Sequence, residues 1–227
     1  MTAPGLRRFG GDATAVVLVL HGGQETSKAR SHRLRPAYLR MLPFARDLRA
    51  AGHHAGLAVW ALRNRYRGWN APDLDPVADA RWALDEIQRV HPGAPVVLVG
   101  HSMGGRVALH VAGDPAVAAV CALAPWTPEN EAVDQLAGRT VLIAHGDRDT
   151  VTDPKLSYAY AVRAKEVTDA VCRFDVRDEG HAMLRRPREW RLLVRRFTLG
   201  VLGITEVDHI IASALAKPCP GGLGIPI

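Results

Sequence analysis

The segment VVLVGHSMGGRVAL, residues 96–109, decides how the chain is expected to fold. An apolar run typical of a strand buried on both faces enters Gly-His-Ser-Met-Gly, and a helix with apolar periodicity follows at once. A serine on so sharp a turn needs small residues two positions to either side, because strand and helix approach closely there. Gly100 and Gly104 meet this demand, so the segment predicts a nucleophilic serine at Ser102. A Gly-rich turn with an incidental serine is the alternative.

Around this segment, short β-branched runs alternate with longer helical patterns. The alternation predicts an α/β fold: a doubly wound, mostly parallel sheet of about six core strands with helices on both faces. The expected strands are residues 16–20, 56–61, 96–99, 117–123, 141–144 and 171–176. The expected helices are about 36–51, one from Pro76 to just before Pro92, 103–112, 155–165, 188–201 and 206–216. Asp75 is expected to cap the helix that begins at Pro76.

The composition is that of one ordinary globular domain. Of the 227 residues 48% are hydrophobic, enough for a core that needs neither disulfides nor a metal. We expect the domain at residues 1–203, followed at 204–227 by a helix and a Pro- and Gly-rich tail with little order. Three cysteines without metal-ligand spacing favour a reducing compartment, the cytoplasm. No apolar run is long enough to span a membrane, and the N-terminus lacks a signal-peptide core.

Lys+Arg 29 against Asp+Glu 23 give a net charge of +6. The positive charges cluster at 28–35, 63–67 and 185–196 without a zinc pattern or an aromatic RNA-binding signature, so nucleic acid is not an expected partner. The first two clusters occupy loops expected to cover Ser102, with cations at Lys28, Arg30, Arg33, Arg35, Arg63, Arg65 and Arg67. These cations indicate either a site entrance that favours substrates with an anionic group or basic side chains that are simply exposed to solvent. The second interpretation is the stronger one.

A serine hydroxyl is a poor nucleophile unless a histidine removes its proton and a carboxylate orients that histidine. Acidic residues follow the fifth expected strand in His-Gly-Asp-Arg-Asp, residues 145–149, which leaves Asp147 and Asp149 as candidates. A histidine follows the sixth strand in Asp-Glu-Gly-His, residues 178–181. The predicted triad therefore consists of Ser102, an acid at Asp147 or Asp149, and His181. His101 and His145 are expected to pack.

These motifs resemble those of the α/β-hydrolase family, from about Val16 to the helix ending near Val201. The order serine, acid, histidine is the one the family uses, and in it the acid is commonly the last Asp of the fifth-strand motif, which selects Asp149. The resemblance implies a serine hydrolase. A nucleophilic serine disfavours the dehalogenase and epoxide-hydrolase types, which place an Asp at this turn.

Acyl transfer builds negative charge on a carbonyl oxygen, which backbone N–H groups stabilise. The residue after the nucleophile supplies one donor, so the Met103 amide is predicted. The second is expected from Leu-His-Gly-Gly-Gln, residues 20–24, which resembles the family's His-Gly motif. Gly23 is the predicted donor and Gln24 the alternative.

Residues 125–139, between the fourth and fifth expected strands, are too few for the helical lid that many family members carry there. An open site is therefore expected. Gln24 and Trp126 are predicted to contact substrate, and packing on the edge of the sheet is the alternative for Trp126.

Together these features predict a carboxylesterase-like serine hydrolase that cleaves esters of small or medium acyl groups through an acyl-enzyme, without metal or organic cofactor. Peptidase or amidase action and acyl transfer are alternatives on the same triad. A receptor-like protein that binds a small molecule is the alternative outside enzymes.

Overall fold

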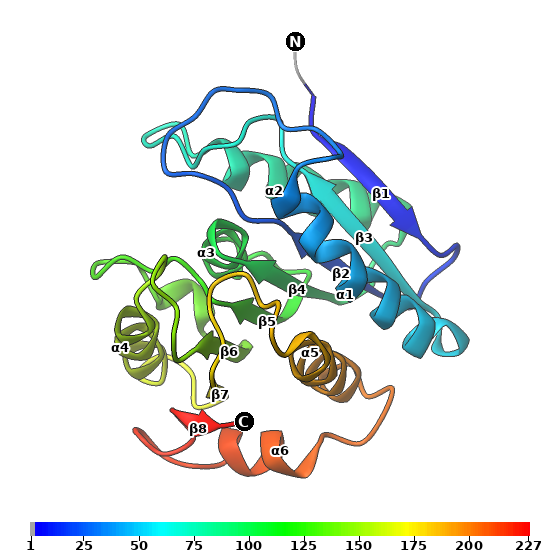
Figure 1. The fold of residues 1–227 in the computed structure, drawn as a ribbon. Helices are drawn as coiled ribbons and strands as arrows, with labels where there is room; N and C mark the ends of the chain where they lie inside the picture. The colour runs from blue at the N-terminus through cyan, green and yellow to red at the C-terminus, as the bar shows by residue number, and fades with distance from the viewer. Residues whose placement is uncertain (1–2) are drawn as a thin grey trace.

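The computed structural model describes residues 3–227, which form one mostly parallel sheet with helices on both faces (Figure 1). Among these residues eight strands lie in the order β1-β3-β2-β4-β5-β6-β7-β8. Neighbouring strands pair in parallel, except that β1 runs antiparallel to β3. The strands are β1 Gly5–Phe9, β2 Ala15–Leu20, β3 Leu57–Arg63, β4 Val96–His101, β5 Val117–Leu123, β6 Thr140–Gly146, β7 Val171–Val176 and β8 Ile225–Pro226.

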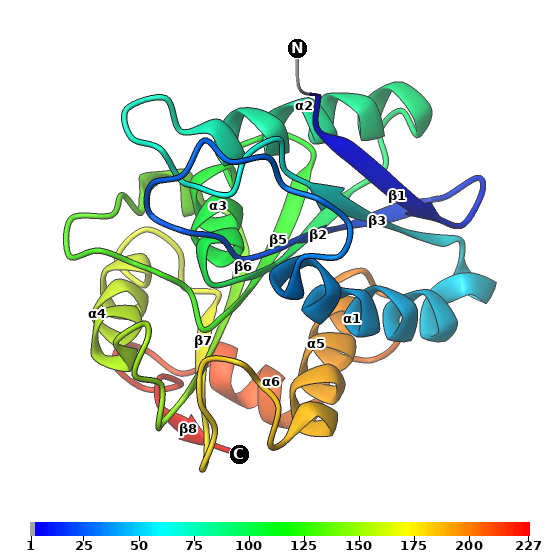
Figure 2. The same ribbon diagram turned by 45° about the horizontal axis from the view of Figure 1, so that its top comes forward.

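Two helical layers enclose the sheet, as Figure 2 shows from a second angle. The α-helices are α1 Pro36–Gly52, α2 Asp75–Val90, α3 Met103–His110, α4 Pro154–Ala164, α5 Pro187–Val201 and α6 His209–Leu215. Helices α1, α5 and α6 share one core with Val17 and Val19 of β2, whereas α2, α3 and α4 share the other with Val16 and Leu18. Alternate residues of one strand thus enter opposite cores, which is why the central strands read as unbroken apolar runs. The predicted α/β class is confirmed.

The six expected core strands and the expected helices are all present, with ends that differ by a few residues. The two outermost strands, β1 and β8, were not expected. β1 reads GLRRF and leaves both arginines exposed, so it has no clean apolar alternation. β8 contains only two residues, one of them a proline. Both positions are at an edge of the sheet, where burial imposes little pattern on the sequence.

Two local expectations were wrong, one about Asp75 and one about the C-terminal tail. Asp75 does not cap α2, because Leu74 occupies the cap position and Asp75 is the first helical residue. Its Oδ2 accepts hydrogen bonds from Lys28 Nζ and Asn70 Nδ2, at 2.7 and 2.8 Å.

The C-terminal tail was expected to have little order, yet it is paired with the sheet. The Arg173 amide donates to the Gly222 carbonyl and the Ile227 amide to the Asp175 carbonyl, both at 2.9 Å. Upstream of this contact, Ile211 of α6 is buried in the core shared by α1 and α5. Backbone pairing, which depends little on side-chain identity, therefore fixes a segment whose Pro and Gly content suggested a loose tail.

The connection between β5 and β6 contains only a short 3-10 helix, Asp134–Leu136. It leaves the carboxyl ends of the central strands without a helical lid, as the length of this connection predicted. Over residues 3–227, the helices are too short or too polar for any of them to cross a bilayer.

Candidate active site

Ser102 stands on the sharp turn between β4 and α3. Its backbone has φ 57° and ψ −121°, a region that non-glycine residues rarely occupy and that is kept only where the surroundings enforce it. A Cβ on Gly100 would overlap the Gly104 carbonyl, and one on Gly104 would approach the Leu20 carbonyl oxygen to 2.5 Å. The two glycines thus allow strand and helix to meet at the serine. The Ser102 amide donates to the Leu123 carbonyl at 2.9 Å, which anchors the turn to β5.

The structure brings the three predicted catalytic side chains together. Ser102 Oγ lies 2.9 Å from His181 Nε2, and His181 Nδ1 lies 2.8 Å from Asp149 Oδ2. Asp149 follows β6 and His181 follows β7, so all three lie beyond the carboxyl ends of parallel strands, where ligands bind in open α/β sheets. The alternative acid, Asp147, is exposed.

Asp149 is held by a ring of donors. Its Oδ1 accepts the amides of Val151 and Thr152 at 2.8 and 3.0 Å. Its Oδ2 accepts the Thr152 hydroxyl at 3.0 Å, in addition to His181. Burial by itself would raise the pKa of Asp149, but hydrogen bonds from His145, His181 and the two amides hold that pKa well below its usual range. The carboxylate therefore stays ionised.

His145 contributes one of these donors. Its Nε2 lies 3.2 Å from Asp149 Oδ2 and 3.1 Å from the Thr152 carbonyl oxygen. Both atoms accept, so Nε2 carries the proton. Its Nδ1 lies 2.8 Å from Ser157 Oγ. Sequence reasoning assigned His145 to packing and missed its contact with the acid; its position four residues before Asp149 was the available signal.

The loop that carries His181 is tied down by Glu179, which is 2% exposed. Its carboxylate accepts four hydrogen bonds, from the amides of Gly180 (2.9 Å), Arg185 (3.1 Å) and Arg186 (2.8 Å) and from the indole of Trp190 (3.3 Å). Donors from the loop and from α5 thus converge on one buried carboxylate. Glu179 was not predicted, because the sequence does not show whether the side chain of an acid near a catalytic histidine points into the protein or toward solvent.

The predicted oxyanion donors lie beside the serine. A Cβ on Gly22 would be 3.2 Å from Ser102 Cβ, and one on Gly23 would overlap the Met103 side chain, so this loop packs directly on the turn. The Gln24 amide donates to the Arg67 carbonyl at 2.8 Å and is therefore engaged elsewhere. Within residues 3–227 the amides of Gly23 and Met103 have no acceptor. Gly23 and Met103 remain the better pair.

The Trp126 side chain packs against Arg106 and Trp69. The guanidinium of Arg106 lies between two indoles, 3.9 Å from the ring centre of Trp69 and 4.3 Å from that of Trp126. Glu131 pairs with Arg106 at 2.5 Å. The Trp126 amide donates to the Ser102 carbonyl at 3.2 Å, so this stack also borders the nucleophile.

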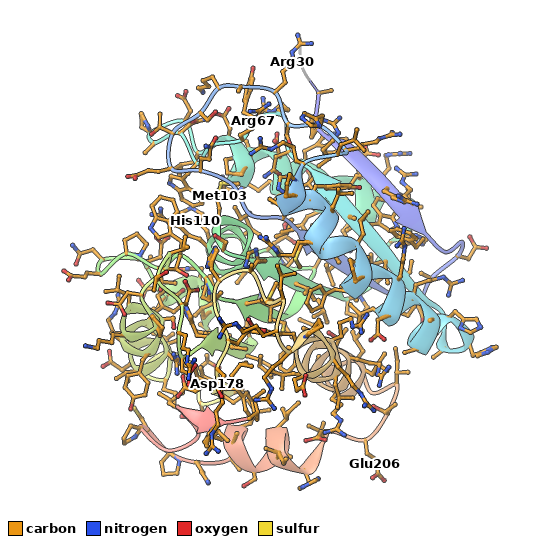
Figure 3. All side chains as sticks on the ribbon, viewed as in Figure 1. Arg30, Arg67, Met103, His110, Asp178 and Glu206 are labelled. Carbon is orange, nitrogen blue, oxygen red and sulfur yellow. The ribbon has the colours of Figure 1, made fainter. Side chains whose placement is uncertain are left out.

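Two of the seven cations of the covering loops form ion pairs with carboxylates. Lys28 pairs with Asp73 and Asp75 at 2.7 Å, and Arg65 pairs with the buried Asp79. Figure 3 shows Arg30 and Arg67 on these loops, on the far side of Met103 from the C-terminal half. The other five cations, Arg30, Arg33, Arg35, Arg63 and Arg67, form no ion pair with a carboxylate within residues 3–227. Over residues 3–227 there is also no group of three potential metal ligands.

Solved structures with low sequence identity share the fold. A serine hydrolase homologue from Coxiella burnetii is 20% identical, with a TM-score of 0.63 over 86% of this chain and 90% of that chain. A serine hydrolase without a lid from Xanthomonas campestris is 17% identical, with a TM-score of 0.62 over 90% and 91%. A monoacylglycerol lipase from Paleococcus ferrophilus is 15% identical, with a TM-score of 0.63 over 89% and 99%. No curated protein matches the sequence.

The family comparison covers most of the chain. The sequence profile of the alpha/beta hydrolase family matches residues 16–218. This match spans Ser102, Asp149 and His181 and six of the eight strands, all but the outermost two. The chain belongs to the alpha/beta hydrolase family.

Proposed function

We propose that the protein is a serine hydrolase that cleaves carboxylic esters of small or medium acyl groups. The observation that carries this proposal is the unbroken hydrogen-bonded row from Ser102 Oγ through His181 to Asp149 Oδ2. Each link is within the distance over which a proton is transferred or a tautomer is fixed. The similarity in fold to a monoacylglycerol lipase agrees with an ester substrate.

The first half of the reaction forms an acyl-enzyme. Ser102 Oγ attacks the ester carbonyl carbon while its proton passes to His181 Nε2, and the carbonyl π electrons move to the oxygen. The amides of Gly23 and Met103 stabilise this oxyanion, each by about 3 kcal/mol. When the oxyanion collapses, the bond to the alcohol oxygen breaks and His181 returns the proton to that oxygen.

Water completes the cycle. It attacks the acyl carbon as His181 takes its proton. When the second tetrahedral intermediate collapses, the bond from the acyl carbon to Ser102 Oγ breaks, His181 returns the proton to Oγ, and the acid is released. Asp149 stays ionised throughout, because its donors keep its pKa low. It holds His181 with Nδ1 protonated, which leaves the Nε2 lone pair facing the serine.

No step of this mechanism needs a metal or an organic cofactor. The short β5–β6 connection leaves the site open to a small-molecule ester. The buried free thiols of Cys121 and Cys172 fit the cytoplasmic location that we propose.

The test is labelling with a fluorophosphonate probe combined with turnover of p-nitrophenyl butyrate. We expect wild type to be labelled and active, and Ser102→Ala to be neither. Ser213→Ala, an exposed serine of α6, is the matched control and should behave as wild type. Failure of a folded wild type to be labelled would overturn the proposal and favour a receptor-like binder. Preference for the matched p-nitroanilide would instead indicate an amidase.

A further inference from the structure

A polar cavity of about 310 Å³ lies at the β1 side of the sheet, apart from the triad. Its lining consists of Gly5, Leu6, Arg7, Arg33, Tyr38 and Arg63. We propose that this cavity is a binding site for a phosphate monoester group. The group is either part of the substrate or a free ligand, and both present the same dianion to the arginines.

Strand pairing places two of the arginines on one face. In the antiparallel β1–β3 pair Gly5 lies opposite Arg63 and Arg7 lies opposite Ala61, so Arg7 and Arg63 are diagonal neighbours on the same face. A Cβ on Gly5 would come within 2.8 Å of the Arg63 guanidinium. The missing side chain at Gly5 therefore provides the space in which that guanidinium lies.

The positive charge of the cavity is not balanced. Over residues 3–227, Arg7, Arg33 and Arg63 form no ion pair with a carboxylate. Tyr38, which is 4% exposed, feels all three: burial raises the pKa of its hydroxyl and the three positive charges oppose that rise. Like charges gathered without a counter-ion repel one another, and a bound anion removes that repulsion.

The start of α1 adds to the same imbalance. Its first turn contains no acidic residue, and its cap position is Arg35, which makes no side-chain capping bond. The amino end of a helix carries partial positive charge and normally attracts Asp or Glu. Here Arg33 and Tyr38 lie on either side of that end and line the cavity. The lining of the cavity thus comes from the first turn of α1, from the β1–β3 pair and from the loop before α1.

The arrangement fits phosphate better than carboxylate. Arginine donates in a planar fork that matches two oxygens of an anion, and a phosphate monoester offers three oxygens and about two negative charges near neutral pH. Three guanidinium groups and a phenol supply more donors than one carboxylate could accept.

The cavity is connected to the triad through His21. The Asn64 amide, next to Arg63, donates to His21 Nε2 at 3.2 Å, and His21 Nδ1 donates to the Gly22 carbonyl at 2.7 Å. The His21 ring also packs edge-on against Tyr38, with centroids 5.8 Å apart. An anion bound at Arg63 and Tyr38 therefore adjoins the loop that ends in the proposed oxyanion donor Gly23.

Binding of inorganic phosphate, measured by isothermal titration calorimetry at about pH 8 where the dianion prevails, tests the site without relying on enzyme activity. The variants are Arg33→Gln and the pair Arg7→Gln with Arg33→Gln, whose exposed side chains can be changed without disturbing the core. Arg46→Gln, exposed farther along α1, removes an equal charge as the control.

We expect saturable binding to wild type and to Arg46→Gln, about tenfold weaker binding to Arg33→Gln, and binding of acetate weaker than that of phosphate. Absence of phosphate binding to wild type at about 10 mM, or equal affinity in wild type and the double variant, would overturn the proposal. Acetate bound as tightly as phosphate would overturn the assignment to a phosphate group.

A second arm, which rests on the proposed esterase activity, identifies the source of the phosphate. It compares p-nitrophenyl butyrate with a p-nitrophenyl ester whose acyl chain ends in a phosphate. If the group belongs to the substrate, wild type prefers the phosphorylated ester and Arg33→Gln loses that preference. If it is a free ligand, inorganic phosphate changes butyrate turnover by wild type and not by the double variant.

Discussion

The imidazole of His101 donates from Nε2 to the backbone carbonyl of His181 at 2.8 Å. The residue before the proposed nucleophile thereby holds the main chain of the proposed base, across 80 positions of sequence. A carbonyl oxygen only accepts, so His101 carries its proton on Nε2. Burial above all, and then the charge of His181, lower the pKa of His101 to about 3. His101 is thus a neutral side chain that links the turn at Ser102 to the loop that carries His181.

Loss of the hydrogen bond from His101 to the His181 carbonyl should slow catalysis without affecting substrate binding. We expect His101→Phe to lower kcat for p-nitrophenyl butyrate about tenfold, the equivalent of one hydrogen bond, with KM unchanged. His101→Gln should recover most of the rate, because its amide can donate to the same carbonyl. Steady-state kinetics of the two variants check this, and equal rates for both would contradict it.

Glu179 should matter for activity although it does not face the serine. Glu179→Ala leaves four N–H groups without their acceptor. We expect a loss of about 3 kcal/mol in the free energy of unfolding and a kcat lowered about 10- to 100-fold. Urea denaturation and kinetics measure the two effects. Glu166→Ala, at an exposed glutamate, is the control, and a Glu179→Ala protein that keeps full activity would refute the positioning role.

The turn at Ser102 should not tolerate a methyl group at Gly100. Because a Cβ there would overlap the Gly104 carbonyl, we expect Gly100→Ala to cost at least about 3 kcal/mol and to lower Tm by about 6 to 12 °C. Gly11→Ala is the matched control, since a Cβ on Gly11 meets nothing within 4 Å. Differential scanning calorimetry of both variants checks the prediction, which a Tm within 2 °C of wild type, roughly 0.5 kcal/mol, would exclude.

Two buried histidines should make the fold sensitive to mild acid. The pKa of His21 is lowered by burial to about 4 and that of His101 to about 3, against 6.5 for an exposed histidine. Between pH 6.5 and 4 the unfolded chain therefore binds about one to two more protons than the folded chain, so stability falls as pH falls. Near pH 5.5 these groups should contribute about 2.5 kcal/mol per pH unit.

Urea titrations at several pH values measure that slope. His21→Asn should reduce it by about 1.4 kcal/mol per pH unit, since one of the two titrating groups is gone. The expectation fails if the slope of wild type is flat over this range or is the same in the variant.

The sequence predicted those parts of the molecule in which the backbone demands a particular residue. Gly100 and Gly104 reveal the turn because only glycine fits there, and the buried strands show themselves because both of their faces are apolar. His181 and the pair Asp147 and Asp149 could be located because they lie in loops after such strands, and the resemblance to the family then selected Asp149.

The supporting residues could not be predicted in this way. Glu179, His145 and Thr152 act through contacts inside loops that turn sharply, with partners only 1 to 11 positions away, so the path of the loop decides which side chains meet. The residue type does not show whether the carboxylate of a glutamate faces inward or faces solvent. The same holds for the edge strand β1, whose arginines read as surface charge until β3 is placed beside them.

The short strand β8 has a consequence for how the molecule behaves in a crowded solution. Without residues 217–227, the β7 backbone would lose its hydrogen bonds to Gly222 and Ile227 and would present an open row of amides and carbonyls. Such a row is a template for pairing with the sheet of another molecule. β8 ends that risk with two residues, one of them a proline that cannot donate to a further strand. By pairing with β7, the C-terminal segment thus covers a row of backbone groups that would otherwise be open to a strand of another molecule.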